Sequence, residues 1–231
     1  MVKTALLIGA SGGLGRSVLR AFSKSQWRVL CADLHKPEDA GAFYLIDKND
    51  SISTTQDKLL EFVGSNKIDS VVNVAGGWTG GDISHASAAR DAELLFQQSV
   101  LSSVVAAHVY ARKGAPASVL VLTGAAAATQ PTPSMLAYGL AKSSVHFLCK
   151  SVAQDEAVKE KKGSVLCLLP TTLDTLSNRQ AMPDASRSEW TPLSDVANQI
   201  IEWSNSEAGR PTSGSLVRIT TKDGSTRFVI E

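Results

Sequence analysis

The 231-residue sequence has few cysteines, no block of like charge and no basic cluster. Its three cysteines, Cys31, Cys149 and Cys167, are odd in number and set among apolar residues, which argues against a disulfide framework. They predict buried free thiols in a reducing compartment, so we expect a cytoplasmic protein. Lys and Arg total 23 against 22 for Asp and Glu, which disfavours nucleic acid and anionic membranes as partners. The expected ligand is a small molecule.

Long apolar runs and grouped metal ligands are also lacking. The opening MVKTALLIGASGG has an apolar run only about as long as a strand, which argues against a signal peptide. No stretch approaches the roughly 20 apolar residues that a membrane span needs. The four histidines, at positions 35, 85, 108 and 146, are scattered, so we expect no metal site.

Short apolar segments alternate with longer segments of helical period along the chain. This alternation is typical of a parallel sheet covered by helices on both faces. The expected strands are 4–9, 27–33, 42–47, 69–76, 118–124, 163–170 and 214–221. The expected helices are 13–25, 54–65, 88–112, 136–161 and 193–205. The composition is 43% hydrophobic and does not shift along the chain, so we expect a single α/β domain over residues 1–231, with a doubly wound parallel sheet.

The last segment, SLVRITTKDGSTRFVIE, has a different pattern. Two β-rich runs flank Asp223-Gly224, a dipeptide suited to a tight hairpin turn with positive φ. We therefore expect an antiparallel strand to end the sheet.

A glycine-rich turn follows the first strand, in LLIGASGGLGRSV. Glycine at 9, 13 and 15 suits a tight turn, close approach of a pyrophosphate and free N–H groups at a helix N-terminus. We interpret the turn as a dinucleotide site, with a purely structural βα turn as the alternative. The expected cofactor contacts are Gly9, Ser11, Gly12, Gly13, Leu14 and Gly15.

An acidic residue, Asp33, ends the second strand. Its carboxylate is placed to accept hydrogen bonds from an adenosine ribose and to repel a 2′-phosphate. This favours NADH, with NADPH as the less preferred cofactor, and Leu34 is expected beside it. The alternative is that Asp33 caps the next turn, and His35 and Lys36 would soften the discrimination.

Tyr138 and Lys142 lie four residues apart on an expected helix, so they project from one face. A tyrosine with its ordinary pKa of about 10 is a poor acid at neutral pH unless a cation stabilises the phenolate. Lys142 would supply that cation and hold the nicotinamide ribose. The alternative is a buried helical tyrosine beside a lysine that reaches solvent.

Together these motifs resemble the short-chain dehydrogenase/reductase family across most of the chain. The motifs are Gly-x-x-x-Gly-x-Gly at 9–15, Asp47, NVAGG at 73–77, Tyr138-x-x-x-Lys142 and LPTTLDT at 169–175. The resemblance implies a Rossmann-type fold, a nicotinamide cofactor and a homodimer formed by 88–112 and 136–161. It also implies cofactor contacts from Asp47, Asn73, Ala75, Gly76, Gly77, Lys142, Pro170, Leu173 and Thr175.

Two members of that family's usual catalytic set do not match. The expected serine falls at or close to Ala125, in the alanine-rich stretch before Tyr138. The expected helix asparagine falls near Gln97, Gln98 or Ser99. Loss of an oxyanion-stabilising donor commonly costs about 2.7–4 kcal/mol. The nearby hydroxyls, none at the usual spacing, belong to Thr123, Thr129 and Ser134.

Trp78 follows the fourth strand, at the sheet edge where α/β proteins bind ligands. Its indole could stack on a flat heterocycle or plug the end of the sheet. With YGLAKSSVHFLC, LPTTLDTLSNRQAMP, WTPL and GRPTSGSL, this segment resembles the pterin-reducing members of the family, including their alanine-rich stretch. The narrower resemblance implies reduction of a quinonoid dihydropterin, with Tyr138 handling the proton.

Residues 170–192 are rich in polar and turn residues, so we expect a flap over the substrate. Asn178 is a candidate substrate contact, as are Arg179 and Met182, although ordinary loop packing explains each equally well. The spacing of His146 and Cys149 after Lys142 indicates no chemistry.

Two further functions remain open. One is reduction of another planar or carbonyl substrate, with Ser99, Gln98 or a loop hydroxyl as the missing donor. The other is a non-catalytic dinucleotide-binding protein, which the intact Tyr138/Lys142 pair argues against.

Overall fold

One eight-stranded sheet organises the protein, which a computed structural model describes over residues 2–231. The strand order is β3-β2-β1-β4-β5-β6-β7-β8, with all neighbours parallel except β7 and β8. This confirms the expected single α/β domain. The strands are β1 Thr4–Ile8, β2 Arg28–Asp33, β3 Ala42–Leu45, β4 Ile68–Asn73, β5 Gly114–Thr123, β6 Ser164–Pro170, β7 Leu216–Lys222 and β8 Ser225–Ile230.

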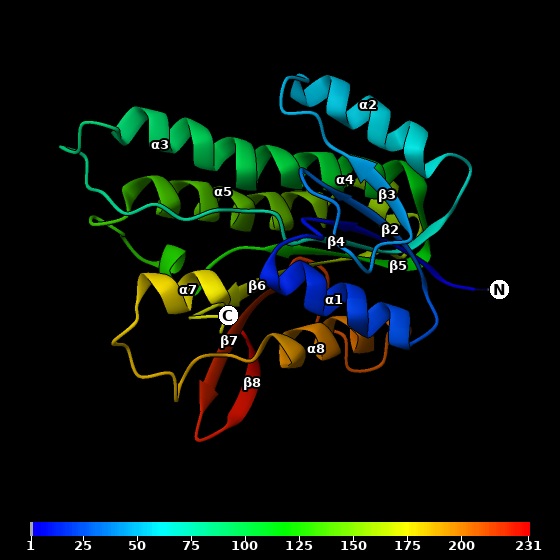
Figure 1. Cartoon of the computed structure of the whole chain (residues 1–231). Helices are drawn as coiled ribbons and strands as arrows, with labels where there is room; N and C mark the ends of the chain where they lie inside the picture. The colour runs from blue at the N-terminus through cyan, green and yellow to red at the C-terminus, as the bar shows by residue number, and fades with distance from the viewer. Residues whose placement is uncertain (1) are drawn as a thin grey trace.

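Helices cover both faces of the sheet (Figure 1). On one face lie α1 Gly13–Lys24 and α8 Leu193–Asn205, and on the other lie α2 Ile52–Val63, α4 Ser102–Lys113 and α5 Leu136–Val152. A π-helical segment, η1 Phe96–Leu101, joins α3 Ala88–Leu95 to α4 without a break. The short helices are η2 Ala126–Thr129, α6 Glu156–Lys159 and α7 Leu176–Ala181.

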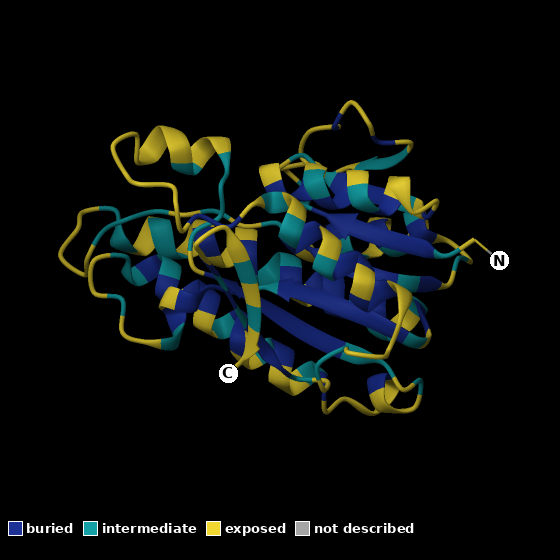
Figure 2. Cartoon of the chain, turned by 90° about the horizontal axis from the view of Figure 1, so that it is seen from below, coloured by how far each residue is buried: buried dark blue, intermediate teal, exposed yellow. Residues whose placement is uncertain are grey.

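The core forms two layers because successive strand residues point to opposite faces. On β1, Leu6 belongs to the layer that includes Val109 and Val145 of α4 and α5. Its neighbour Leu7 belongs to the layer that includes Phe22 and Ile200 of α1 and α8. Figure 2 shows the buried strands between helices whose outer sides are exposed. Burial on both faces explains why the strands are apolar runs.

Two expected helices differ in detail. The helix expected over 136–161 stops at Val152, and a new helix begins where the Asp155 carboxylate accepts a hydrogen bond from the Ala157 N–H at 2.9 Å. The helix expected over 88–112 includes the π-helical segment, where Ser102 and Ser103 donate to the carbonyls four residues before them. Such side-chain bonds compete with regular helical geometry.

The C-terminal hairpin is confirmed. Asp223 and Gly224 have φ of 51° and 73°, as a turn of this kind requires. β8 runs antiparallel to β7 and closes the edge of the sheet, while β7 itself pairs in parallel with β6.

The continuous helix of residues 88–113 contains an 18-residue window that is, by length and composition alone, apolar enough to cross a membrane, with a mean hydropathy of 1.2. This differs from the expectation that no stretch of the chain approaches the apolar length of a membrane span. However, 44% of its apolar window is buried in the protein, where the helix packs on the sheet and on α5. The core explains much of its apolar character.

Candidate active site

The turn between β1 and α1 fits a dinucleotide phosphate. Gly9 has φ of 85°, and a Cβ added to Gly15 would overlap the Gly9 carbonyl oxygen. The N-cap residue of α1, Gly12, offers no side-chain cap, and the first turn carries no acidic residue. The backbone N–H groups of the first turn of α1 are thus available to bind an anion. Thr175 lies opposite, with its methyl group 3.4 Å from the position of a Cβ on Gly13.

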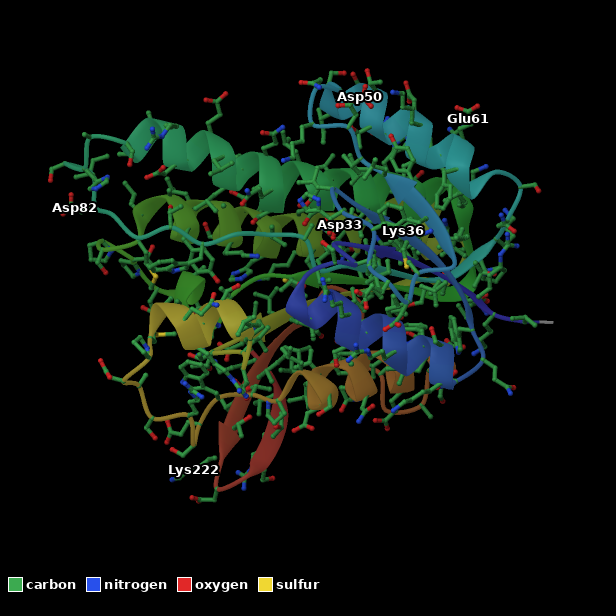
Figure 3. All side chains as sticks on the ribbon, viewed as in Figure 1. Asp33, Lys36, Asp50, Glu61, Asp82 and Lys222 are labelled. Atoms are coloured by element: carbon green, nitrogen blue, oxygen red, sulfur yellow. The ribbon has the colours of Figure 1, made fainter. Side chains whose placement is uncertain are left out.

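Asp33 is fixed against the same turn. Its carboxylate accepts hydrogen bonds from the backbone N–H of Ser11 at 2.7 Å and of Leu34 at 2.6 Å. Figure 3 labels Asp33 near the start of α1 and Lys36 in the loop beyond β2. By contrast, Asp47 is exposed and accepts hydrogen bonds from Asn49 in its own loop. Asp33 therefore belongs to the phosphate turn, whereas Asp47 lies farther along the same edge.

The loop 73–77 is held from within by Asn73, which is fully buried. The amide nitrogen of Asn73 donates to the Ser102 and Ser103 hydroxyls at 3.1 and 3.0 Å, and its oxygen accepts from the Ala75 N–H at 3.1 Å. This side chain bonds to α4 and to the loop, so its role is to position the loop. Any ligand contacts of the segment would therefore come from the residues after Asn73.

Lys142 lies behind that loop, buried at 4% exposure. Its Nζ donates to the Thr123 carbonyl at 2.9 Å and lies 3.0 Å from the position of a Cβ on Gly76. Burial lowers the pKa of Lys142 to about 8. The lysine is thus fixed between the ends of β4 and β5.

Tyr138 lies one turn before Lys142, with the ammonium nitrogen 5.9 Å from the centroid of the phenol ring. Burial raises the pKa of Tyr138 to about 12. This differs from the expectation that the lysine lowers this pKa, because loss of hydration outweighs a cation at that distance. At neutral pH the phenol is therefore protonated, which is the form that a proton donor needs.

The alanine-rich segment after β5 provides no hydroxyl at the position of the expected serine. Ala125 is 2% exposed, and its N–H donates to Nε2 of His146 on α5 at 3.2 Å. The Thr123 hydroxyl donates to the Asn73 carbonyl at 3.0 Å, and the Thr129 hydroxyl donates to the Ala126 carbonyl at 2.9 Å. These threonines are therefore engaged elsewhere and do not stand in for the missing serine.

His146 is a site residue that the sequence patterns missed. The available signal was its position four residues after Lys142, on the face of α5 that carries the reactive pair. Its partner, Ala125, is 21 positions away and has no distinctive side chain. Ala125 makes this contact through its backbone N–H, so no sequence motif predicts it.

Of the three candidates for the missing helix asparagine, Ser99 lies near the site, beside Gly76 and on the same side of it as Lys142. Its hydroxyl is buried, has no hydrogen-bond partner among residues 2–231 and lies 3.3 Å from the position of a Cβ on Gly76. Gln98 packs its amide oxygen against Gly77, while Gln97 is exposed.

Trp78 and Met182 offer apolar surface on the segments beyond β4 and β6, at 61% and 40% exposure. The Trp78 indole lies over Gly80, with a ring carbon 3.3 Å from the position of a Cβ there. A side chain so exposed does not plug the sheet. It is available as a stacking surface.

The expected flap is a short helix, α7, followed by an exposed loop. At the end of this loop, Thr191 pairs with Leu173 in an isolated parallel β-bridge. The Asn178 amide nitrogen donates to the Leu173 carbonyl at 2.8 Å, and Arg179 forms a two-point ion pair with Asp174 at 2.6 Å. These contacts brace the segment that follows Pro170.

The fold and the site define the class of protein. A family model described as short chain dehydrogenase matches residues 3–186, and the chain belongs to the short-chain dehydrogenase/reductase family. It is an NAD(P)H-dependent oxidoreductase with a site for a nicotinamide dinucleotide.

A narrower similarity links the chain to a protein of Dictyostelium discoideum named dihydropteridine reductase. The two are 35% identical over 224 residues, and the match covers 96% of each chain.

Solved structures share the fold. A short-chain dehydrogenase family protein from Francisella tularensis is 18% identical, with a TM-score of 0.81 over 94% of this chain and 97% of that one. BdcA, solved in complex with NADPH, is 20% identical, with a TM-score of 0.77 over 96% of this chain and 93% of that one.

Proposed function

We propose that this protein uses NADH to reduce a quinonoid dihydropterin, such as quinonoid dihydrobiopterin, to the tetrahydropterin. The observation that carries the proposal is the end of β5, where Ala125 replaces a hydroxyl donor while Tyr138 and Lys142 are retained. Such a site can deliver a proton but has no serine to polarise a carbonyl. Similarity to the Dictyostelium dihydropteridine reductase supports the same substrate class.

The chemistry of the substrate explains why the serine is dispensable. A quinonoid dihydropterin is a conjugated, electrophilic C=N system, which gains a hydride and a proton as NADH becomes NAD⁺. The bound nicotinamide would supply the hydride. The electron pair is received by delocalised ring nitrogens and not by a single carbonyl oxygen, so a separate hydroxyl donor contributes little.

The residues of the chain have separate roles in this reaction. Tyr138, protonated at neutral pH, donates the proton, and the Lys142 ammonium stabilises the phenolate that remains. Lys142 also holds the nicotinamide ribose. Trp78 stacks on the pterin, and Asn178 borders the substrate from α7.

The residues that would hold the cofactor lie along the carboxyl edge of the sheet, from the glycine turn to the loop after β6. Asp33, held by Ser11 and Leu34, accepts the adenosine ribose and disfavours the additional phosphate of NADPH. The other proposed contacts are those expected at 9–15, Asp47, 73–77, Pro170, Leu173 and Thr175.

Two copies of the chain pair through the helices of residues 88–112 and 136–161, in the cytoplasm. Large apolar side chains are exposed on these helices, including Val104, Leu140 and Phe147, the last at 74% exposure. Analytical ultracentrifugation of the Phe147→Glu variant should show monomers where the wild type shows dimers. An unchanged dimer would place the contact elsewhere.

The rate of NADH oxidation tests the proposed function. The purified protein should oxidise NADH rapidly with freshly generated quinonoid dihydrobiopterin, more slowly when NADPH replaces NADH, and not with the 7,8-dihydro isomer. Reduction of simple ketones or quinones but not of the pterin would favour another substrate. NADH binding without any hydride transfer would favour a binding role.

A further inference from the structure

His146 is a buried titratable residue with no part in the reaction described above. It lies on α5 at 7% exposure, and its Nε2 accepts the hydrogen bond from the Ala125 N–H at 3.2 Å. The imidazole also fills the space beside Gly124. A Cβ on Gly124 would overlap the ring and lie 2.8 Å from a methyl group of Leu169. The ring and the bare backbone are therefore matched in shape as well as in hydrogen bonding.

The contact forms one half of a two-point clasp, defined by the bonds Lys142 Nζ–Thr123 O and Ala125 N–His146 Nε2. Both bonds run from α5 to the end of β5, on either side of Gly124. The Gly124 N–H itself donates to the Leu168 carbonyl at 2.8 Å on the neighbouring strand. The Gly124 N–H and the Thr123 carbonyl belong to one peptide unit, so β6 holds one side of this unit, and the bond from Ala125 to His146 fixes the next peptide and limits rotation of the carbonyl that anchors Lys142.

We propose that His146 is a positioning residue for Lys142, acting as a neutral acceptor that fixes the backbone of residues 123–125. The inference deepens the proposed function, since Lys142 is the cation of the proposed proton donor. It also assigns a role to the alanine-rich segment. At Ala125, where the family has a serine side chain, the functional group is the backbone N–H that bonds to His146.

The charge state of His146 is consistent with this role. Burial and the nearby Lys142 and Lys150 lower the pKa of His146 to about 4. Burial raises the pKa of the Cys167 thiol, on the adjacent β6, to about 12, although the charge of Lys142 acts in the opposite direction. At neutral pH the imidazole and the thiol are thus both uncharged, and Nε2 is free to accept.

The wild-type protein provides the first test. ¹⁵N NMR at neutral pH should show Nε2 of His146 without a proton and Nδ1 with one. Hydrogen exchange should show the Ala125 amide protected. A protonated Nε2, or an Ala125 amide that exchanges as fast as those of exposed loops, would overturn the proposal whether or not any variant folds.

Variants separate positioning from packing. His146→Leu removes the acceptor, His146→Gln keeps an oxygen near the place of Nε2, and Val145→Ala truncates a fully buried neighbour that does not bond to Ala125. In His146→Leu, Ala125 exchange should rise and pterin turnover fall, each about tenfold. His146→Gln should recover most of both, and Val145→Ala should change neither more than about twofold beyond its effect on global stability.

The ionisation of Lys142 is the sharpest readout, because a purely structural role would not move it. The Thr123 carbonyl stabilises the ammonium form, so a looser bond between this carbonyl and Lys142 in His146→Leu should shift the Lys142 titration to lower pH. NMR of ¹³C-labelled lysine measures this without substrate. If the titration and Ala125 exchange match the wild type while stability falls, His146 serves packing alone. If the wild type fails to reduce the pterin, the proposed function fails, and these two readouts still decide the role of His146.

Discussion

The glycine turn after β1 and the alanine-rich segment after β5 lie at the same edge of the sheet but are specified differently. In the turn, Gly9 and Gly15 are required by backbone geometry within seven residues, and the motif is visible in the sequence. In the alanine-rich segment, Ala125 acts through a backbone bond to His146, which only the fold brings close. The glycine turn thus depends on a local pattern, whereas the end of β5 depends on a long-range contact.

The difference teaches how one family can change its substrate. The turn must accept the same phosphates in every dinucleotide-binding member, so its geometry leaves little choice. At the end of β5 the Thr123 carbonyl binds Lys142, and the Ala125 N–H is bound by a histidine on α5 where the family's serine is absent. A site that gives up a hydroxyl suits a substrate whose charge is delocalised.

The largest expected effect comes from filling the glycine turn. Gly15→Ala places a methyl group on the Gly9 carbonyl oxygen, so we expect loss of measurable NADH binding and a fall of about 3 kcal/mol in the free energy of unfolding. Fluorescence titration and thermal melts measure both. Gly41→Ala is the control, because a Cβ there has no neighbour within 4 Å. Wild-type NADH affinity in Gly15→Ala would refute the assigned geometry.

Removal of the Tyr138 hydroxyl should impair the chemical step without weakening cofactor binding. Tyr138→Phe should lower kcat at least about a hundredfold while the Kd for NADH stays within about twofold. The matched control is Tyr110→Phe, which removes a buried hydroxyl bonded to the Ser118 and Ser164 carbonyls and should cost only stability, about 1 kcal/mol. Unchanged turnover in Tyr138→Phe would remove this residue from the chemistry.

The charge of Lys142 predicts a pH dependence. Its lowered pKa of about 8 means that the required ammonium is present below that pH and lost above it. Accordingly, kcat/KM for NADH, which reports the free enzyme, should fall about tenfold per pH unit well above 8. Lys142→Arg keeps its charge, so its overall rate should be lower but its alkaline decline should disappear. An identical decline in both proteins would assign it to another group.

The sequence predicts most of the fold because its signals are local. Strand runs, the glycine turn and the Asp223-Gly224 hairpin each depend on adjacent residues, and all three are found. The break after Val152 has a local cause in the Asp155 cap, but the apolar pattern continues through it.

The candidate site could be predicted only in part. The sequence places Tyr138 and Lys142 on one helix face, but their pKa values depend on burial, which the fold decides. Likewise, Asn73 points to α4 because Ser102 and Ser103, some 30 positions later, offer hydroxyl partners. Long-range partners of this kind leave no spacing to recognise.

The smallest expected change is the most direct test of the central claim, that this site reduces a quinonoid pterin without a serine. The measurement is the turnover of quinonoid dihydrobiopterin with NADH by wild-type protein and by Ala125→Ser, assayed side by side against the uncatalysed background. The predicted result is rapid turnover by both proteins, within about twofold of each other. A gain of tenfold or more in Ala125→Ser, or no turnover above background by either protein, would contradict the account.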